Sequence, residues 1–244
     1  MSEIMPQVSS SINALMLEFE TITHNMANVN TAGFKRRCNA FSQSLEAQQT
    51  GTETYSPGNI GLISTIDFSQ GNASDTGRPL DFALHGKGFF VIETPNGPLY
   101  TRNGIFLRNQ NGQIIDAQGR IVAGEGGPIT IPDDVGVAQV SVSSDGSLSA
   151  GGTTIGKFQL VDFEDNEDKL VPAGSNCYLM PDKNIHPVAA ENIVVKQRCQ
   201  EVSNVIIIDE LVNLMMVSRL YEANMKFIGA RKEMAGSIIS AAMA

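Results

Sequence analysis

Glycine and proline are distributed very unevenly along this 244-residue chain, and this distribution most constrains how the chain can fold. Residues 1–37 and 200–244 together hold only three of the 23 glycines and one of the ten prolines. Because glycine and proline interrupt helices and favour turns, both ends are predicted to be helical and the middle to consist of strands and turns. We therefore expect an α+β fold with terminal helices and a central antiparallel β domain.

Charge follows the same division. The chain has 26 acidic and 17 basic residues, a formal net charge of −9, and residues 38–199 carry nearly all of this excess. Nearly neutral ends are typical of surfaces that associate with other proteins, whereas a charged middle is expected to face water. The acidic balance argues against nucleic acid as a partner, because binding phosphates requires a basic face.

The first segment has apolar residues at spacings of three and four, which place them on one face of a helix. This helix is predicted to end near Asn28, before the turn that contains Gly33. A stripe of this kind must be buried against another helix, so we interpret it as an assembly interface. Its residues are Ile4, Val8, Ile12, Leu15, Phe19, Ile22 and Met26.

The last segment shows a similar heptad-like spacing over about four heptads. Ser203 is predicted to cap the start of this helix, and the register also passes through the polar residues Ser218 and Lys232. We expect the helix to pair with the N-terminal stripe as a coiled coil and to be covered further by neighbouring chains. Its predicted interface residues are Leu211, Leu214, Tyr221, Met225 and Ile228.

The middle of the chain alternates short apolar runs with turn sequences. Residues 89–92 are followed by Pro95-Asn96-Gly97, and residues 140–142 by Asp145-Gly146. Asp-Gly and Asn-Gly pairs supply the positive φ angles of tight hairpins, which indicates a compact antiparallel β domain. The predicted segments are an N-terminal assembly helix and turn (1–37), an extended linker (38–66), a β-rich domain (67–199) and a C-terminal assembly helix (200–244).

We predict neither catalytic residues nor a metal site nor a cofactor site, and hence no enzyme activity. The histidines His24, His85 and His186 have no second His or Cys at ligand spacing, and the three cysteines form no CxxC pair. The stretch Gly86-Lys87-Gly88 lacks the frame of a phosphate-binding loop.

Membrane insertion is not expected either. The chain has no apolar run approaching the ~18 residues that span a bilayer. Its first basic residue is Lys35, so the positive region of a signal peptide is missing. We expect a protein that stays inside the cell or leaves it by a route without a cleavable signal.

Residues 25–35 have the sequence Asn-Met-Ala-Asn-Val-Asn-Thr-Ala-Gly-Phe-Lys and resemble a motif that flagellar rod and hook proteins carry at the end of their first helix. In physical terms, the motif ends a helix, turns at a glycine and anchors an apolar ring. Residues 77–84 and 203–224 are similar to the same family, and among its members proximal-rod subunits fit best. The fixed positions of the motif are all present: Asn25, Ala27, Asn28, Thr31, Gly33, Phe34 and Lys35.

This resemblance implies a structural subunit of the basal-body rod. Such subunits assemble helically, with copies of themselves and other rod subunits, into the drive shaft that crosses the periplasm and transmits torque from motor to hook. The terminal helices would form a coiled coil in the inner tube, and the β domain an outer layer. The flagellar type III export apparatus would export the chain without signal cleavage.

Other functions remain as alternatives. A distal-rod or hook-type subunit of the same family is the main one. A secreted enzyme would require a clustered acid, base or nucleophile in the β domain, which the sequence does not show. A coiled-coil adhesin would not require the motif at residues 25–35.

Overall fold

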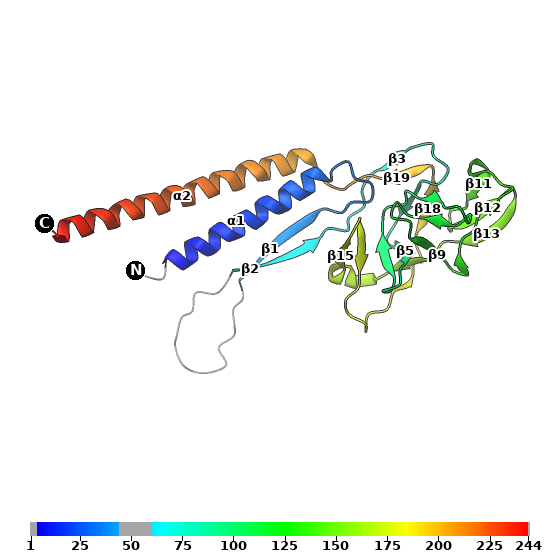
Figure 1. Ribbon diagram of the computed structural model, residues 1–244, viewed down its shortest axis with the longest axis horizontal. Coiled ribbons are helices and arrows are strands. Elements are labelled where there is room, and N and C mark those ends of the chain that lie inside the picture. Colours follow the sequence, from blue (N-terminus) through cyan, green and yellow to red (C-terminus); the bar gives the residue numbers. More distant parts are fainter. Residues whose placement is uncertain (1–3, 44–59, 244) are drawn as a thin grey trace. The chain divides into compact units, whose positions relative to one another are not determined.

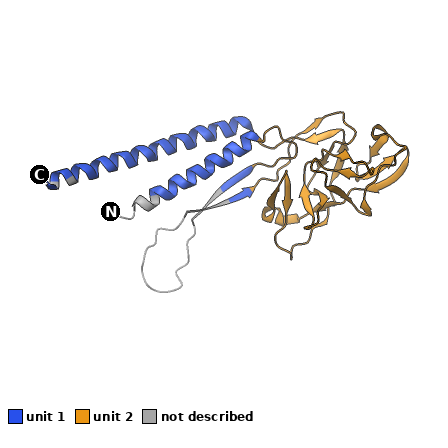
Figure 2. Cartoon of the chain, viewed as in Figure 1, with its two compact units in different colours: residues 1–27, 37–65, 206–244 blue, residues 28–36, 66–205 orange. Residues whose placement is uncertain are grey.

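A computed structural model describes residues 4–43 and 60–243 and divides the chain into two compact units (Figures 1 and 2). The first, which we call the helical unit, lies within residues 1–27, 37–65 and 206–244. The second, the β unit, comprises residues 28–36 and 66–205. The chain therefore passes between the units after residues 27, 36, 65 and 205.

The helical unit is built on two long helices that lie side by side (Figure 1). Helix α1 (Ile4–Ala27) has 24 residues and ends where the sequence predicts, and helix α2 (Ile207–Met243) has 37 residues. They pack through a small apolar cluster in which Ile22 and Val217 are the most thoroughly buried residues. Terminal helices around a central β domain are thus confirmed.

Helix α2 begins four residues later than the predicted cap at Ser203, and that prediction is wrong. The Ser203 hydroxyl accepts a hydrogen bond from the backbone N–H of Val205, at 3.2 Å, before the helix starts. Asp209 and Glu210 lie in the first turn of α2, as the sequence predicts, and acidic side chains there favour a helix start because they compensate the helix dipole.

The segment predicted as an extended linker contains paired strands at both of its ends. Strands β1 (Arg37–Gln43) and β2 (Ile60–Ile66) form a two-stranded sheet, and residues 44–59 lie outside the described part of the chain. Strand β1 is also held to α1, because the Asn39 amide donates to Glu18 Oε2 at 2.9 Å and to Thr21 Oγ1 at 2.8 Å. These two strands belong mainly to the helical unit, which the polar composition of the segment did not indicate.

The β unit consists of short antiparallel strands and two 3₁₀ turns, η1 (Val137–Gln139) and η2 (Glu164–Lys169). Its strands are β3 (Ala73–Asp75), β4 (Phe82–His85), β5 (Phe89–Glu93), β6 (Leu99–Thr101), β7 (Leu107–Arg108), β8 (Ile114–Ile115), β9 (Ile121–Gly124), β10 (Gly127–Pro128), β11 (Val140–Val142), β12 (Ser147–Ala150), β13 (Thr153–Lys157), β14 (Leu160–Asp162), β15 (Val171–Gly174), β16 (Cys177–Leu179), β17 (Val188–Ala189), β18 (Val194–Gln197) and β19 (Cys199–Glu201).

The largest sheet has the order β15-β16-β6-β5-β9-β8-β7, with β10 paired to β9 and with β14 joining β5 to β17. Strands β11, β12 and β13 form a second sheet, and β4 pairs with β18 and β3 with β19. The predicted hairpins are confirmed: Phe90 pairs with Thr101 across β5 and β6, and Val142 with Leu148 across β11 and β12.

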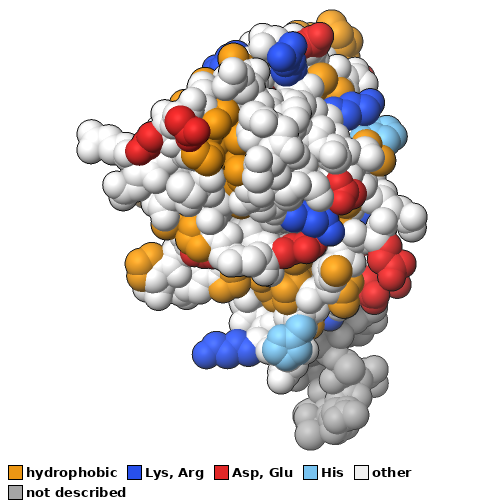
Figure 3. All heavy atoms as spheres, turned by 90° about the vertical axis from the view of Figure 1, so that its right-hand side faces the viewer, with side chains coloured by type: hydrophobic (Ala, Val, Ile, Leu, Met, Phe, Trp, Pro, Cys, Tyr) orange, Lys and Arg blue, Asp and Glu red, His pale blue; other side chains and the backbone are white. Residues whose placement is uncertain are grey.

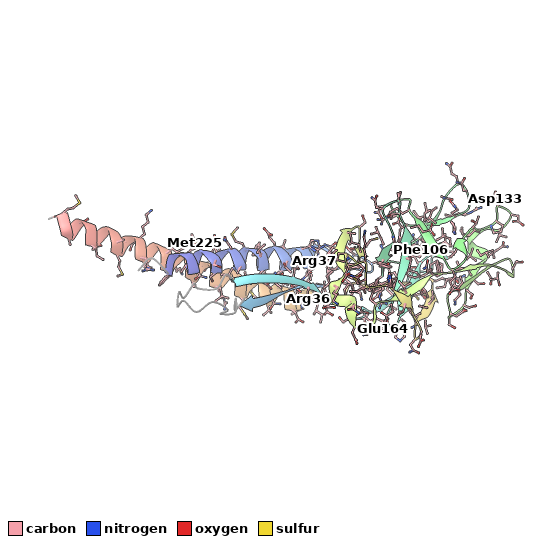
Figure 4. The ribbon with its side chains drawn as sticks, turned by 90° about the horizontal axis from the view of Figure 1, so that it is seen from below. Arg36, Arg37, Phe106, Asp133, Glu164 and Met225 are labelled. Atoms are coloured by element: carbon pink, nitrogen blue, oxygen red, sulfur yellow. The ribbon has the colours of Figure 1, made fainter. Side chains whose placement is uncertain are left out.

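Aromatic rings fill the main core between these strands. The rings of Phe82, Phe90 and Phe106 lie around Phe158, with centroid distances to it of 5.1, 5.3 and 5.9 Å. All four side chains are excluded from solvent, and Phe106 is labelled in Figure 4. Tilted and edge-to-face rings of this kind each contribute beyond the area that they bury, so the β unit has a core of its own.

The face of the molecule in Figure 3 carries acidic and basic side chains dispersed among uncharged ones. Dispersed charges of both signs are typical of a surface that stays in contact with water.

Candidate assembly site

The turn after α1 is closed by hydrogen bonds among the motif residues themselves. Thr31 donates from its backbone N–H to the Asn28 carbonyl at 3.0 Å and from its hydroxyl to Asn28 Oδ1 at 3.2 Å. The Phe34 N–H then donates to the Thr31 carbonyl at 3.2 Å. Two successive turns therefore form between Asn28 and Phe34, which explains why the motif has Asn and Thr three residues apart.

Gly33 occupies a place where no other residue fits without strain. Its φ angle is +68°, and a Cβ atom built on it would lie 2.5 Å from the backbone nitrogen of Asn103. Its own N–H donates to the Glu201 carbonyl at 2.8 Å. The next residue, Phe34, is almost fully buried in the β unit, as expected for an apolar anchor.

Lys35 forms a buried ion pair, although lysine is among the residues that are least often buried. Its Nζ atom lies 2.6 Å from Glu201 Oε1 and also donates to the Ser69 carbonyl at 2.6 Å. The side chains of Lys35 and Glu201 are 1% and 2% exposed. Burial lowers the pKa of the Lys35 ammonium, although the charge of Glu201 and its hydrogen bond act in the opposite direction.

Arg102 completes this charged cluster. Its Nη1 atom lies 3.7 Å from Glu201 Oε2, its Nη2 donates to the Gly86 carbonyl at 2.8 Å, and its guanidinium lies 5.4 Å from the centre of the Phe89 ring. Two cations thus share one nearby carboxylate, which leaves a single excess positive charge in the buried cluster of Lys35, Arg102 and Glu201.

Further acids act on Arg102 from η2 and the strand before it. The charges of Glu167 and Asp162 both raise the pKa of Arg102, against the larger effect of burial, which lowers it. Burial raises the pKa of Glu167 itself, and the positive charge of Lys87 offsets part of that increase.

Asn25, the first motif residue, has a separate role in the helical unit. Its side-chain amide donates to the Arg37 carbonyl at 2.8 Å and accepts from the Arg37 N–H at 2.9 Å, as a neighbouring strand would. The same amide donates to Glu210 Oε1 of α2 at 3.4 Å. Asn25 therefore links α1, the start of β1 and the first turn of α2.

Many large apolar side chains on the two helices remain exposed. On α1 they are Met16, Leu17 and Phe19. On α2 the exposed set includes Ile207, Ile208, Leu211, Val212, Met215, Met216, Leu220, Tyr221, Met225, Phe227, Met234 and Ile238. Met225, which is labelled in Figure 4, is 46% exposed. So many exposed large apolar side chains on two helices are typical of a protein–protein interface.

Comparison with known proteins gives two family-model matches and several relatives that align over most of the chain. Residues 83–150 match the model described as "Flagellar hook protein FlgE/F/G D1 domain", and residues 196–241 match "Flagellar basal body rod FlgEFG protein C-terminal". The chain is 33% identical over 211 residues to the flagellar basal-body rod protein FlgF of Mesorhizobium japonicum, covering 86% of this chain and 85% of the relative. The chain belongs to the flagellar basal-body rod protein family.

Relatives named FlgG are about as similar to this chain as those named FlgF. The flagellar basal-body rod protein FlgG of Bacillus subtilis is 32% identical over 256 residues, which cover 95% of this chain and 96% of the relative. The FlgG protein of Buchnera aphidicola subsp. Baizongia pistaciae is 32% identical over 250 residues, covering 92% and 94%. Family membership therefore does not distinguish an FlgF-type from an FlgG-type subunit.

The structure of this rod-family chain brings some of the predicted interface residues together and leaves others apart. Leu15, Ile22, Met26 and Leu214 meet in the cluster between α1 and α2. Val8, Ile12 and Ile228 are half-buried, and the side chain of Ile4 lies outside the described part of the chain. The predicted residues that stay exposed are Phe19, Leu211, Tyr221 and Met225.

Sequence reasoning missed Val217, the most buried apolar residue of α2. The predicted register passed through Ser218 instead. A spacing of three from Leu214 to Val217 and four from Val217 to Tyr221 would have selected this face. That signal was hidden because apolar residues occur nearly all around the first half of α2, so its periodicity does not select a single face.

The motif is also divided between the two units. Asn25 and Ala27 belong to the helical unit, where Ala27 ends α1, and the residues from Asn28 to Lys35 belong to the β unit.

The role of Glu201 as the partner of Lys35 was missed, because a single buried acid 166 residues away leaves no local sequence signal.

Proposed function

We propose that this chain is a structural subunit of the bacterial flagellar rod, which assembles helically with copies of itself and with other rod subunits into the drive shaft. The exposed apolar surface of α1 and α2 carries this proposal. After the two helices have packed on each other, side chains such as Phe19, Leu220 and Met225 are still exposed. Neighbouring chains would bury them, and contacts repeated with a screw offset would build an open filament.

In the assembled rod, the helices would continue as a coiled coil in the inner tube, and the β unit would form the outer layer. The relatives named as basal-body rod proteins support the placement of the chain in the rod. Torque would pass from motor to hook through many such contacts in parallel. We propose no catalytic, metal-binding or cofactor-binding role for the chain.

Within the rod we propose a proximal, FlgF-type position, because residues 124–132 and 145–149 resemble the proximal-rod subunit. The alternative is an FlgG-type, distal-rod position, and the longer alignments with FlgG proteins favour it. Expression of this chain in strains that lack either FlgF or FlgG would discriminate between them. Restored swimming in only one of the two strains would identify the position.

We further propose that the flagellar type III export apparatus delivers the subunit to the periplasm without cleavage. No helix in residues 4–43 or 60–243 is long and apolar enough to cross a membrane, and neither nucleic acid nor direct membrane insertion is part of the proposed role. N-terminal sequencing of the subunit from isolated basal bodies tests this route. A subunit shortened at its N-terminus by a signal peptidase would contradict it.

The main test is incorporation into basal bodies. A tagged copy of the chain should restore swimming to a strain that lacks the chromosomal copy, and the tag should be found in purified hook–basal bodies. If the protein is instead found only in the culture medium or at the cell surface while swimming is normal, an adhesin or a secreted enzyme would be the better assignment.

A further inference from the structure

Three of the four places where the chain passes between the units are adjacent to one asparagine. Asn204 Oδ1 accepts from the Arg36 N–H at 2.7 Å, and its Nδ2 donates to the Asp67 carbonyl at 2.8 Å. Asp67 and Arg36 are also joined directly, because the Asp67 N–H donates to the Arg36 carbonyl at 2.8 Å. Arg36, which is labelled in Figure 4, is the last residue before the chain enters β1.

A second set of contacts, more deeply buried, joins the same three segments. Glu201 Oε1 accepts from Lys35 Nζ at 2.6 Å and from the Gly71 N–H at 3.0 Å. The Glu201 carbonyl accepts from Gly33, and the Ser69 carbonyl from Lys35. The segments approach so closely that a Cβ atom on Gly71 would lie 1.9 Å from the Val202 carbonyl oxygen.

We propose that residues 33–36, 67–71 and 201–204 form a clasp, in which Glu201 and Asn204 make three connecting segments open and close together. Tension on one connecting segment would then be shared by the other two, and would not peel that segment away from the β unit. This device rests on the proposed function only for its purpose, which is to transmit torque within a subunit. The clasp itself is a property of the folded chain.

The physical reason for joint opening is that the three segments share acceptors and donors. Releasing residues 33–36 removes Lys35, one of the partners of the buried Glu201 carboxylate, and breaks the hydrogen bond between Asn204 Oδ1 and the Arg36 N–H at the same time. Releasing residues 67–71 likewise breaks the bond from the Gly71 N–H to Glu201 and the bond from Asn204 Nδ2 to the Asp67 carbonyl. Since a buried polar group without its partner costs free energy, partial opening is disfavoured relative to opening of the whole clasp.

Amide hydrogen exchange of the full-length protein tests the clasp. The backbone N–H groups of Gly33, Arg36, Asp67 and Gly71 all donate within it. In the wild-type protein these four amides should exchange through one common opening. In the Asn204→Ala variant, all four should exchange about tenfold faster or more, which is the effect of losing about 1.4 kcal/mol of hydrogen bonding.

A matched control comes from Asn109, another asparagine that organises the backbone around it. Its Oδ1 accepts from Asn111 at 2.9 Å and from Gln113 at 2.8 Å, all within one hairpin. The Asn109→Ala variant should accelerate exchange only in that hairpin. The Ser143 amide, which bonds Ser147 at 2.9 Å in another hairpin, should not change in either variant.

Two results would overturn the proposal. One is faster exchange at Arg36 alone in Asn204→Ala, with Gly33 and Gly71 unchanged, because the segments would then open independently. The other is equal acceleration at Ser143, which would show general destabilisation. If Asn204→Ala does not fold, Asn204→Asp, which keeps the acceptor for Arg36 and loses the Nδ2 donor, should accelerate Asp67, Arg36, Gly33 and Gly71 together.

Swimming provides the functional arm of the test. Cells with Asn204→Ala should assemble rods but lose speed more steeply than wild type as the viscosity of the medium rises. If the wild-type chain never enters the rod, the proposed function fails, and the exchange result still decides whether the clasp exists.

Discussion

Lys35 and Glu201 are 166 positions apart in the sequence, yet their charged atoms are 2.6 Å apart in a site that solvent barely reaches. This ion pair gives a physical reason for the lysine at the end of the rod-protein motif. A residue that only extended into solvent would not need to be a lysine. Arg102 lies on the other side of the carboxylate, so the two partners of the ion pair are not equivalent.

We expect Glu201→Gln to destabilise the protein more than Lys35→Met. Removing the Glu201 carboxylate leaves Lys35 and Arg102 without the acid that they share, and breaking a buried pair in this way costs about 3–5 kcal/mol. Removing Lys35 leaves Glu201 beside Arg102 and the Gly71 N–H, so the cost should be smaller by about 1 kcal/mol or more. Urea unfolding of the purified full-length variants measures both values.

The double variant provides the control for this prediction. In the presence of Glu201→Gln, the additional change Lys35→Met removes one of the uncompensated cations and should recover part of the lost stability. Equal costs of the two single changes, or strict additivity in the double variant, would show that the charges of Lys35, Glu201 and Arg102 do not act as a cluster.

Gly33→Ala should cost more stability than Gly77→Ala, although both glycines have a φ angle of +68°. A Cβ atom on Gly77 meets nothing within 4 Å, whereas one on Gly33 meets the backbone of Asn103. Both variants should lose about 1 kcal/mol of stability through the strain of a positive φ angle. The additional loss in Gly33→Ala, about 2 kcal/mol, therefore measures the close contact with Asn103 alone. Thermal unfolding compares the pair, and identical melting temperatures would contradict the contact. The same clash should make Gly33→Val fail to enter isolated basal bodies.

Leu214→Asp should disturb the folding of the subunit itself, whereas Leu220→Asp should disturb only its assembly into the rod. Leu214 packs in the cluster between α1 and α2, and a carboxylate there should cost about 2 kcal/mol or more of helix packing, visible as lost helicity by circular dichroism. Leu220 is 50% exposed, so the same substitution should leave the isolated subunit unchanged. In cells, both variants should fail to enter the rod, whereas Glu222→Gln should be incorporated normally. Incorporation of Leu220→Asp at wild-type levels would mean that this face of α2 is not an assembly surface.

Glu167→Gln should stabilise the protein slightly at neutral pH. Burial raises the pKa of this carboxyl above its ordinary value, so the folded state holds its proton more tightly than the unfolded state does. Between the two pKa values, stability therefore falls as pH rises, and the ionised group disfavours folding above this window. The gain in unfolding free energy from Gln should be less than about 0.5 kcal/mol at pH 7, and it should vanish below the ordinary pKa of a glutamate side chain. Unfolding curves of the wild-type and Glu167→Gln proteins at several pH values measure this gain in stability. A gain that increases on acidification would show that folding lowers the pKa of Glu167.

The ends of the chain and the hairpins could be predicted because their signals are local. Helix α1 ends at Ala27, where the motif begins to turn, and the β11–β12 hairpin forms over Asp145-Gly146, with Gly146 at a φ of +86°. Periodicity, turn residues and the distribution of glycine each act over a few positions, so the sequence alone is enough to place them.

The remaining features depend on partners that are distant in the sequence. Glu201 is buried by Lys35 and Gly71, and neither residue indicates the other in advance. Strands β1 and β2 pair with each other in a segment whose polar composition resembles a linker. The face of α2 that contacts α1 could not be selected because its first half is apolar on several faces, a composition suited to more than one neighbour.

The alternation of the two units along the chain also determines the order in which the protein can fold. Closing the loop between Lys35 and Glu201 costs about 4.5 kcal/mol of chain entropy plus a constant, a cost that must be met before their contact forms. Helices α1 and α2 have to meet across an even longer stretch of chain. A chain that is still being synthesised therefore cannot complete the β unit until residues 201–205 have been made, and it cannot complete the helical unit until α2 has followed them. High contact order of this kind slows folding and delays the moment at which the paired helices can present their apolar surface to other subunits.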